Sequence, residues 1–227
     1  MSLNDNARLI ARAATERLRP GGGIDGEDGT SGTAAPTRFL IALAGPPGVG
    51  KSTLSETLRD EIERQGEHAA IVPMDGFHLD NAVLEARGHL ARKGAPFTFD
   101  AEGFRALLTR LRTETGQEIA IPVFDRSLDL ARAGGRLIAP EHRFLIVEGN
   151  YLLLDERPWR DMAGLFDLTV MLTADPLELR ERLVRRWRDH GLDETDALSR
   201  AMSNDIPNAE LVIANSRRPD VALESAG

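Results

Sequence analysis

The stretch that decides the fold runs Gly45-Pro46-Pro47-Gly48-Val49-Gly50-Lys51-Ser52-Thr53. The apolar residues 39–44 precede it and predict a buried parallel strand, whereas residues 53–58 open a helical pattern. A glycine-rich turn between strand and helix, with Lys and Ser directly after its last glycine, forms the phosphate-binding loop (P-loop) pattern. An ordinary connecting turn has no need of Lys-Ser at that place. The stretch therefore predicts a nucleoside triphosphate site.

Each part of this P-loop has a chemical task in the prediction. Its glycines would let the backbone curl so that N–H groups point at phosphate oxygens, and the following helix adds its dipole there. Lys51 would reach the outer phosphates, and the Ser52 hydroxyl would ligate Mg²⁺. The predicted nucleotide-binding residues of the loop are Gly45, Pro46, Pro47, Gly48, Val49, Gly50, Lys51, Ser52 and Thr53.

Length and composition exclude several classes of protein. The 227 residues suit one large domain, and the net charge of −8 argues against nucleic acid as the main partner. The sequence has no cysteine, no visible secretory signal and no apolar run of membrane-spanning length, so we expect a cytoplasmic protein without membrane insertion. Lys51 and Lys93 are the only lysines, and this favours a chemical reason for each.

The chain divides into three parts. Residues 1–20 predict a docked N-terminal helix, residues 21–37 a flexible Gly-rich linker, and residues 38–227 the nucleotide-binding domain. The helix should bury a stripe that includes Leu9 and Ile10. Strands are expected at 69–74, 118–124, 144–149, 168–173 and 210–214, and helices at 101–111 and 176–190. This alternation predicts an α/β fold with a doubly wound, mostly parallel sheet flanked by helices.

Two acids close predicted strands, where ligands bind in open parallel sheets. Glu148 ends residues 144–147 and could hold Mg²⁺, or it could be an acid at the start of a helix. Asp75 follows the second strand and could accept the proton of an attacking hydroxyl, or it could form an Asx turn or cap. Gly76 after it would let the backbone approach a ligand closely.

Arginines are concentrated in the helix at 176–190. Arg182 and Arg185 share one face, which could close as a lid over the transferred phosphate. The same arginines could equally be surface partners of Glu178 and Glu181. The five histidines show no metal-ligand spacing.

Taken together, these motifs resemble the uridine kinase, pantothenate kinase and phosphoribulokinase group. The resemblance rests on the P-loop, Met74-Asp75-Gly76-Phe77-His78, Pro122-Val123-Phe124-Asp125 and Ile146-Val147-Glu148-Gly149-Asn150. Residues 92–100 are similar to the group's "KG-x-P-x-x-FD" segment. The resemblance implies a P-loop kinase fold with a helical lid. It also implies ATP and Mg²⁺ as cofactors, and a small-molecule hydroxyl acceptor as partner. A homodimer is left open.

The resemblance also implies roles for single residues. Asp75 matches the general base beside Lys51, while Arg182 and Arg185 match lid arginines that touch the phosphates. Residues 215–219 would fall at the adenine side. The implied acceptor-binding residues are Asp75, His78, Asp100, Phe124, Asp125 and Arg126.

The acceptor pocket departs from two branches of the group. Uridine kinases have a Tyr and a downstream His there, and pantothenate kinases a His shortly after Pro-Val-Tyr; residues 124–129 hold neither. The chain is more similar to the bacterial fructose-transport-system kinase branch, so we expect a sugar or sugar-like alcohol. A uridine-type nucleoside or pantothenate is the alternative, and a non-catalytic ATP-binding regulator of a transport system is the alternative of another class. The guanine motif of GTPases is absent from the sequence.

Overall fold

The computed structural model describes residues 1–18 and 38–225, so the predicted linker at 21–37 lies outside the described residues. The strands are β1 (Phe39–Ala44), β2 (Ala69–Pro73), β3 (Ile119–Asp125), β4 (Leu130–Ile138), β5 (Phe144–Gly149), β6 (Leu168–Thr173) and β7 (Val221–Glu224). The α-helices are α1 (Leu3–Leu18), α2 (Lys51–Arg64), α3 (Asn81–Ala86), α4 (Ala101–Thr113), α5 (Pro176–Asp189), α6 (Glu194–Arg200) and α7 (Ile206–Asn215). Short 3₁₀ turns are η1 (Met74–Phe77), η2 (Leu90–Arg92), η3 (Pro96–Thr98) and η4 (Trp159–Leu165), and η5 (Ala201–Asp205) is a π-helical turn.

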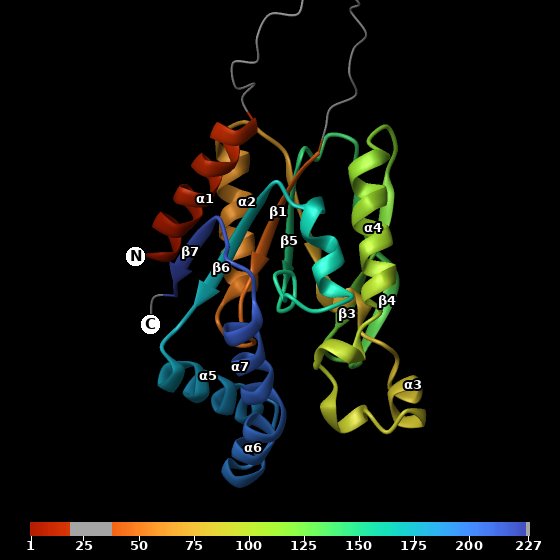
Figure 1. The fold of residues 1–227 in the computed structure, drawn as a ribbon, viewed down its shortest axis with the longest axis vertical. Helices are drawn as coiled ribbons and strands as arrows, with labels where there is room; N and C mark the ends of the chain where they lie inside the picture. The colour runs from red at the N-terminus through yellow and green to blue at the C-terminus, as the bar shows by residue number, and fades with distance from the viewer. Residues whose placement is uncertain (19–37, 226–227) are drawn as a thin grey trace, which may run out of the picture.

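A parallel five-stranded sheet forms the centre of the fold, in the order β2-β5-β1-β6-β7. β1 is buried along its whole length because its six residues are all apolar. The strands run toward one end of the molecule, where α3, α5 and α6 also lie (Figure 1). This confirms the predicted doubly wound α/β fold and puts the carboxyl ends of β1, β2 and β5 at the edge where ligands bind.

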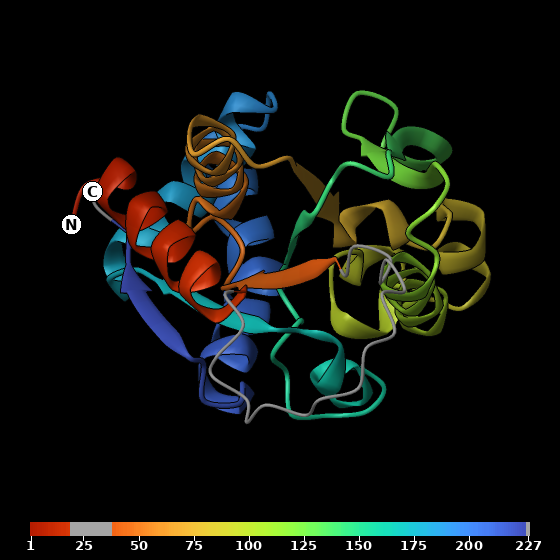
Figure 2. The same ribbon diagram turned by 90° about the horizontal axis from the view of Figure 1, so that it is seen from above.

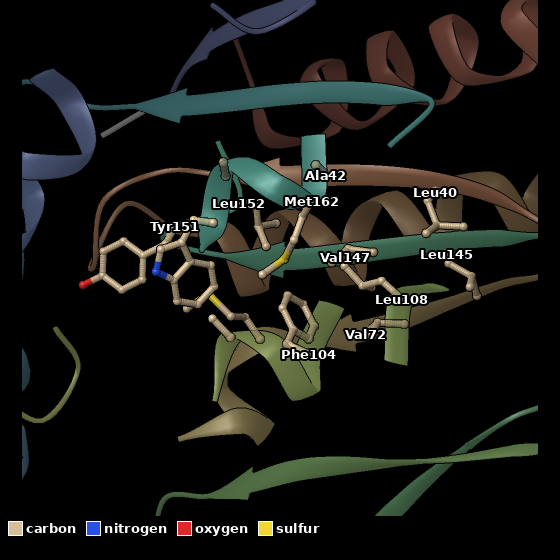
Figure 3. Close-up of a cluster of buried hydrophobic side chains, with 14 of the residues drawn as sticks. Leu40, Ala42, Val72, Phe104, Leu108, Leu145, Val147, Tyr151, Leu152 and Met162 are labelled. Carbon is tan, nitrogen blue, oxygen red and sulfur yellow. The ribbon is translucent and has the colours of Figure 1, made fainter. Parts of the chain in front are cut away.

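Each face of the sheet has its own apolar core, because successive strand residues point to opposite sides. Ile41 and Leu43 face α1 and α2, whereas Leu40 and Ala42 face α4 and η4. Figure 2 shows α1 and α2 on one side of the sheet and α4 on the other. Figure 3 shows the second core, where Phe104 and other α4 side chains meet the sheet. Burying each large side chain contributes about 1.5–3 kcal/mol relative to leaving it exposed.

The predicted N-terminal helix is present as α1 and packs against α2. Ile10 is fully buried as expected, but Leu9 is 37% exposed, because the buried stripe runs instead through Ala7, Ile10, Ala11 and Ala14. The last turn is fixed by Arg17, which donates hydrogen bonds to the Asp167 carbonyl at 2.8 Å and to Asp220 at 2.9 Å.

The strand predicted at 118–124 is present as β3, but it does not join the central sheet. β3 pairs with β4 in a separate antiparallel hairpin, and Pro122 sits where the register shifts. β4 was not predicted at all, since most of its residues are exposed and it contains Gly134 and Gly135. The hairpin reaches over the end of β2, where the backbone of η1 contacts that of β3 at Pro122.

The predicted strand at 210–214 is wrong, because these residues belong to α7. A short apolar run fits either a strand or a buried helix, and here Asn208, Ala209 and Val212 are buried at helical spacing. The last strand is β7 instead. Residues 215–219 follow α7, where the Asn215 carbonyl accepts the Asp155 N–H and the Arg217 N–H donates to the Leu153 carbonyl; their place on the adenine side stays a prediction. Among the described residues, no helix is long and apolar enough to cross a bilayer.

Candidate active site

The P-loop connects β1 to α2 and packs against α5. Gly48 and Gly50 have φ values of 79° and 97°, which glycine adopts without strain, and Gly50 is the N-cap of α2. A Cβ on Gly48 would stand 2.9 Å from the Leu183 side chain. Leu179 and Leu183 of α5 therefore pack directly on the loop, and this contact sets which face of α5 turns toward the nucleotide site.

Lys51 is held over the loop by three acceptors. Its Nζ donates to the carbonyls of Gly45 and Pro46, both at 2.9 Å, and to Asn150 Oδ1 at 2.6 Å. Burial lowers the pKa of Lys51 to about 8, although the nearby carboxylates of Glu148 and Asp75 act in the opposite direction. The ammonium is thus fixed beside the loop backbone, ready for an anion.

Ser52 and Glu148 form a pair of hard oxygen donors next to Lys51. The Ser52 hydroxyl donates a 2.9 Å hydrogen bond to Glu148 Oε2. Burial raises the pKa of Glu148, and neighbouring Asp75 raises it further. A hydroxyl and one carboxylate fit Mg²⁺, which keeps several waters and takes phosphate oxygens as further ligands. Within residues 1–18 and 38–225 no cluster of three acidic or histidine side chains offers a full protein cage.

Asp75 lies in η1, directly after the carboxyl end of β2, and lines the same cavity as Lys51, Ser52 and Glu148. It is close to Arg126 of the hairpin, with 3.8 Å between Arg126 NH2 and Asp75 Oδ2. The expectation that Gly76 admits a ligand is corrected: a Cβ there would stand 2.4 Å from the Pro122 carbonyl oxygen. Gly76 therefore lets the hairpin approach, and the hairpin brings Arg126 to Asp75.

An aromatic wall stands beside Asp75. The His78 ring lies 4.1 Å from the Phe99 ring and 4.6 Å from the Phe124 ring. Its Nδ1 is 2.9 Å from the Asp75 carbonyl oxygen, which only accepts, so Nδ1 carries the hydrogen and Nε2 is left as an acceptor. Burial lowers the pKa of His78, so the ring is neutral at pH 7.

These groups line one cavity of about 950 Å³. The predicted residues that line it are Pro47, Gly48, Gly50, Lys51, Ser52, Thr53, Asp75, His78, Phe124, Arg126 and Glu148. Gly45, Pro46 and Val49 do not line it, because the first two bind Lys51 through their carbonyls and Val49 is buried in the core.

Two predicted acceptor-binding acids lie outside the cavity lining. Asp100 is the N-cap of α4, and its Oδ1 accepts the Gly103 N–H at 2.9 Å. Asp125 caps the hairpin turn, accepting from the Ser127 hydroxyl at 2.6 Å, and pairs with Arg132 at 3.2 Å. Both carboxylates therefore accept hydrogen bonds at local turns, which is a common role for Asp. The family motif alone does not distinguish this role from acceptor binding.

Neither of the two arginines predicted for the lid, the helical region from α5 to η5, lines the cavity. Arg186, not Arg185, lines the cavity, and Arg185 lies on another surface of α5 beside Arg188 and Asp189. Arg182 contacts the P-loop outside the cavity, since its NH1 is 3.4 Å from the Val49 carbonyl, and it also bonds Ser225 after β7. Positions 182 and 186 share a face because they are four residues apart.

Other cavity residues were missed, most of them on the lid and on the segment from η2 to Gly94. The polar and aromatic ones among them, besides Arg186, are Asn81, Lys93, Phe99, Asp129, Asn150, Trp187, His190, Arg200, Asp205 and Asn208. A signal existed for two of them. Asn150 follows Glu148 at the end of β5, and Lys93 stands out as the second lysine of the chain. The remainder come together only through tertiary packing, because they lie on α3, directly after η3, on the β3–β4 turn and in the region from α5 to α7.

A P-loop with an ordered Lys, a carboxylate at the end of a neighbouring strand and a helical lid define a P-loop kinase. Residues 40–222 match the phosphoribulokinase/uridine kinase family. A putative uridine kinase of Schizosaccharomyces pombe is 37% identical over 195 residues, which cover 82% of this chain and 83% of the relative. The pantothenate kinase of Streptomyces avermitilis is 31% identical over 183 residues, covering 77% of this chain and 55% of that enzyme.

A solved structure agrees with these relatives. The crystal structure of a putative fructose transport system kinase from Silicibacter sp. TM1040 is 43% identical, with a TM-score of 0.85, and the match covers 98% of both chains. The chain belongs to the phosphoribulokinase/uridine kinase family and is an ATP-dependent kinase.

Proposed function

We propose that this kinase transfers the γ-phosphoryl group of ATP to a hydroxyl of a small polar metabolite, a sugar or sugar-like alcohol. The observation that carries the proposal is the single cavity shared by Lys51, Glu148 and Asp75. Phosphates on the P-loop and an acceptor against His78 would meet in front of Asp75. A phosphotransferase needs this side-by-side placement of its two substrates.

The transfer itself uses groups that already face the cavity. A bond forms between the acceptor oxygen and the γ-phosphorus while the bond from that phosphorus to the bridging oxygen of ADP breaks. Asp75 takes the proton of the acceptor hydroxyl, and Lys51 and Arg186 neutralise charge on the transferring group. Mg²⁺, when bound by Ser52 and Glu148, would neutralise the phosphates further.

The acceptor side suits a molecule rich in hydroxyls. The Asp75 carboxylate and His78 Nε2 accept hydrogen bonds, and Arg126 donates them. Phe99 and Phe124 offer apolar ring surface against which the C–H face of a sugar can pack. The same rings could stack on a nucleobase, which keeps a uridine-type nucleoside as the alternative acceptor, and pantothenate is the other alternative within the family. We place the kinase in the cytoplasm, where ATP is available.

The proposal is tested by an ATP-consumption screen over sugars, sugar alcohols, nucleosides, pantothenate and glycerate. With the acceptor that responds, Asp75→Asn should lower kcat by about 10²- to 10⁴-fold because the general base is lost. ATP affinity measured by calorimetry should be unchanged or higher, since a negative charge beside the phosphates is removed. Near-normal turnover in this variant would exclude Asp75 as the base. Tight ATP binding without turnover on any acceptor would instead favour the regulator.

A further inference from the structure

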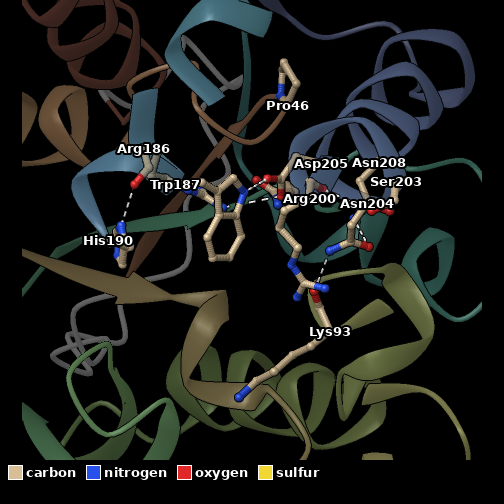
Figure 4. A network of polar contacts seen from close by, with 12 residues as sticks. Pro46, Lys93, Arg186, Trp187, His190, Arg200, Ser203, Asn204, Asp205 and Asn208 are labelled. Atoms are coloured by element: carbon tan, nitrogen blue, oxygen red, sulfur yellow. Dashed lines mark hydrogen bonds and ion pairs between the residues drawn. The ribbon is translucent and has the colours of Figure 1, made fainter. Parts of the chain in front are cut away.

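One buried acid of the cavity has no task in the transfer described above. Asp205 is the last residue of the π-helical turn η5, and its side chain is only 7% exposed. π-helical turns are rare and occur often at functional sites. Figure 4 shows Asp205 between the lid helices, with the Trp187 indole directed toward it.

The Asp205 carboxylate binds two neighbouring side chains of α5. Trp187 Nε1 donates to Asp205 Oδ2 at 2.5 Å, and Arg186 NH2 lies 3.4 Å from Asp205 Oδ1. The guanidinium of Arg186 also packs over the Trp187 ring, 5.3 Å from its centroid, and Arg200 packs on the same ring at 5.2 Å. Arg186 is therefore held by a carboxylate and an aromatic ring, both belonging to the lid.

Arg186 needs such a partner because of the charges that it faces. It lies close enough to Lys51 to lower the pKa of that lysine, as does Arg126. Before an anion binds, these cations repel one another, and this repulsion opposes the placement of Arg186 in the cavity. A buried carboxylate costs desolvation free energy, so its presence here is better explained by the arrangement that it enforces than by stability.

We propose that Asp205 is a positioning residue that holds the Arg186 guanidinium in the cavity, facing the phosphate site, before the nucleotide arrives. This inference rests on the proposed function in one respect, that Arg186 contacts the phosphates of ATP. A cation fixed in advance stabilises developing charge without reorganisation at the moment of transfer. The neighbouring Asn204 turns to the opposite side, donating to the Lys93 carbonyl at 2.8 Å, so η5 links α5 to the segment beside the acceptor.

A double-mutant cycle on nucleotide affinity tests this role. Calorimetry with Mg²⁺-ATP would compare wild type, Asp205→Asn, Arg186→Gln and the double variant. We expect Arg186→Gln to weaken binding about tenfold, since a charge-assisted contact is lost, and Asp205→Asn about threefold. The double variant should bind as weakly as Arg186→Gln, within about twofold, because Asp205 acts only through Arg186. Asn keeps an acceptor oxygen for Trp187, so the lid should still fold.

The matched control is Glu194→Gln, which removes the same charge from an exposed lid pair with Arg188 away from the cavity. Its ATP affinity should stay within about twofold of wild type. Additive losses in the double variant, or wild-type affinity in Asp205→Asn, would overturn the proposal. The double-mutant cycle measures ATP binding and needs no acceptor, so it tests the role of Asp205 even if no phosphoryl transfer is found. A failure of the proposed function would be seen separately, in the acceptor screen.

Discussion

The nucleotide side and the acceptor side of the cavity are built in different ways. Apart from Arg186 of α5, the groups that we propose for the phosphates lie within Gly45–Thr53 or at the end of the adjacent β5, and Lys51 is fixed mainly by carbonyls five and six residues before it. The acceptor side takes its residues from η1, the segment at 90–94, the β3–β4 hairpin and the lid. The first is specified by local chemistry, and the second by tertiary placement, so family members can change acceptor without changing the P-loop.

Lys93 connects two elements of the acceptor side, α3 and the β3–β4 hairpin. Its Nζ donates to Asn81 Oδ1 at 2.7 Å and to the Asp129 carbonyl at 2.6 Å, and it pairs with Asp129 Oδ2 at 2.9 Å. It also stands 5.0 Å over the Phe124 ring. The three donors of the ammonium are thus all used in holding the hairpin against α3. Lys51 and Lys93 each donate to three acceptors placed around one point, an arrangement that a planar guanidinium fits poorly.

The largest effect should come from breaking the nucleotide side. Lys51→Met removes the charge that faces the transferring phosphoryl group, so we expect kcat/KM for ATP to fall about 10³-fold. The melting temperature should change little, because the relief from burying an ammonium is offset by the three acceptors that lose their donor. Steady-state kinetics and thermal melting check both. A loss of less than tenfold would mean that Lys51 does not reach the phosphates.

A smaller and more selective effect is expected on the acceptor side. Lys93→Met should free the hairpin and raise the KM for the acceptor about 30-fold, while the KM for ATP stays within about twofold. Lys93→Arg keeps the charge but cannot satisfy three acceptors placed around one point, and it should give an intermediate value. Equal increases in both KM values would contradict the division into two independently built sides.

This division also explains what could be predicted from the sequence. The P-loop, the strand before it and the acid at Glu148 follow from contiguous patterns, and the structure has all of them in the expected elements. The hairpin partner β4 could not be predicted, because its exposed residues carry no period-two alternation of apolar side chains. The run at 210–214 is apolar enough for a strand, and only the burial of Asn208, Ala209 and Val212 at helical spacing distinguishes it as a helix.

The lid shows a different limit of sequence reasoning. Arg182 and Arg185 share a helix face, but so do Arg182 and Arg186, and no pattern in the arginine run favours one pair. The choice is made by Leu179 and Leu183, whose packing on Gly48 rotates α5 about its axis. Asp205 carried no signal, since it faces the cavity only through the π-helical turn of η5.

The pH dependence of ATP affinity should sharpen the account of the nucleotide side. Burial lowers the pKa of Lys51 to about 8, and phosphates should bind the protonated form, so binding should take up a proton above that pH. The Kd for Mg²⁺-ATP should rise about twofold from pH 7 to 8 and be about tenfold higher at pH 9 than at pH 7. Calorimetry in buffers of different ionisation enthalpy would measure the proton uptake directly. Lys51→Met should abolish this dependence, and an unchanged profile in that variant would assign it to another group.

The smallest effects should come from the two acids that resemblance placed in the acceptor pocket. Asp100→Asn and Asp125→Asn keep an acceptor oxygen at each turn, so we expect the acceptor KM and kcat to stay within about twofold. An increase in acceptor KM above tenfold for either variant would show that its carboxylate binds the acceptor after all.

Thermal melting at different pH values separates a turn-capping role of Asp125 from a substrate role. Its hydrogen bond from Ser127 lowers the pKa of the Asp125 carboxyl in the folded protein. Such a group stabilises the fold above the pKa of the unfolded chain, about 3.9, and loses this contribution as the pH falls through the lower folded value. Asp125→Asn should therefore melt slightly below wild type at pH 7, and the two should converge in strong acid. A difference that persists in acid would mean that the carboxylate charge is not what holds the turn, and that the hairpin depends on the shape of the side chain alone.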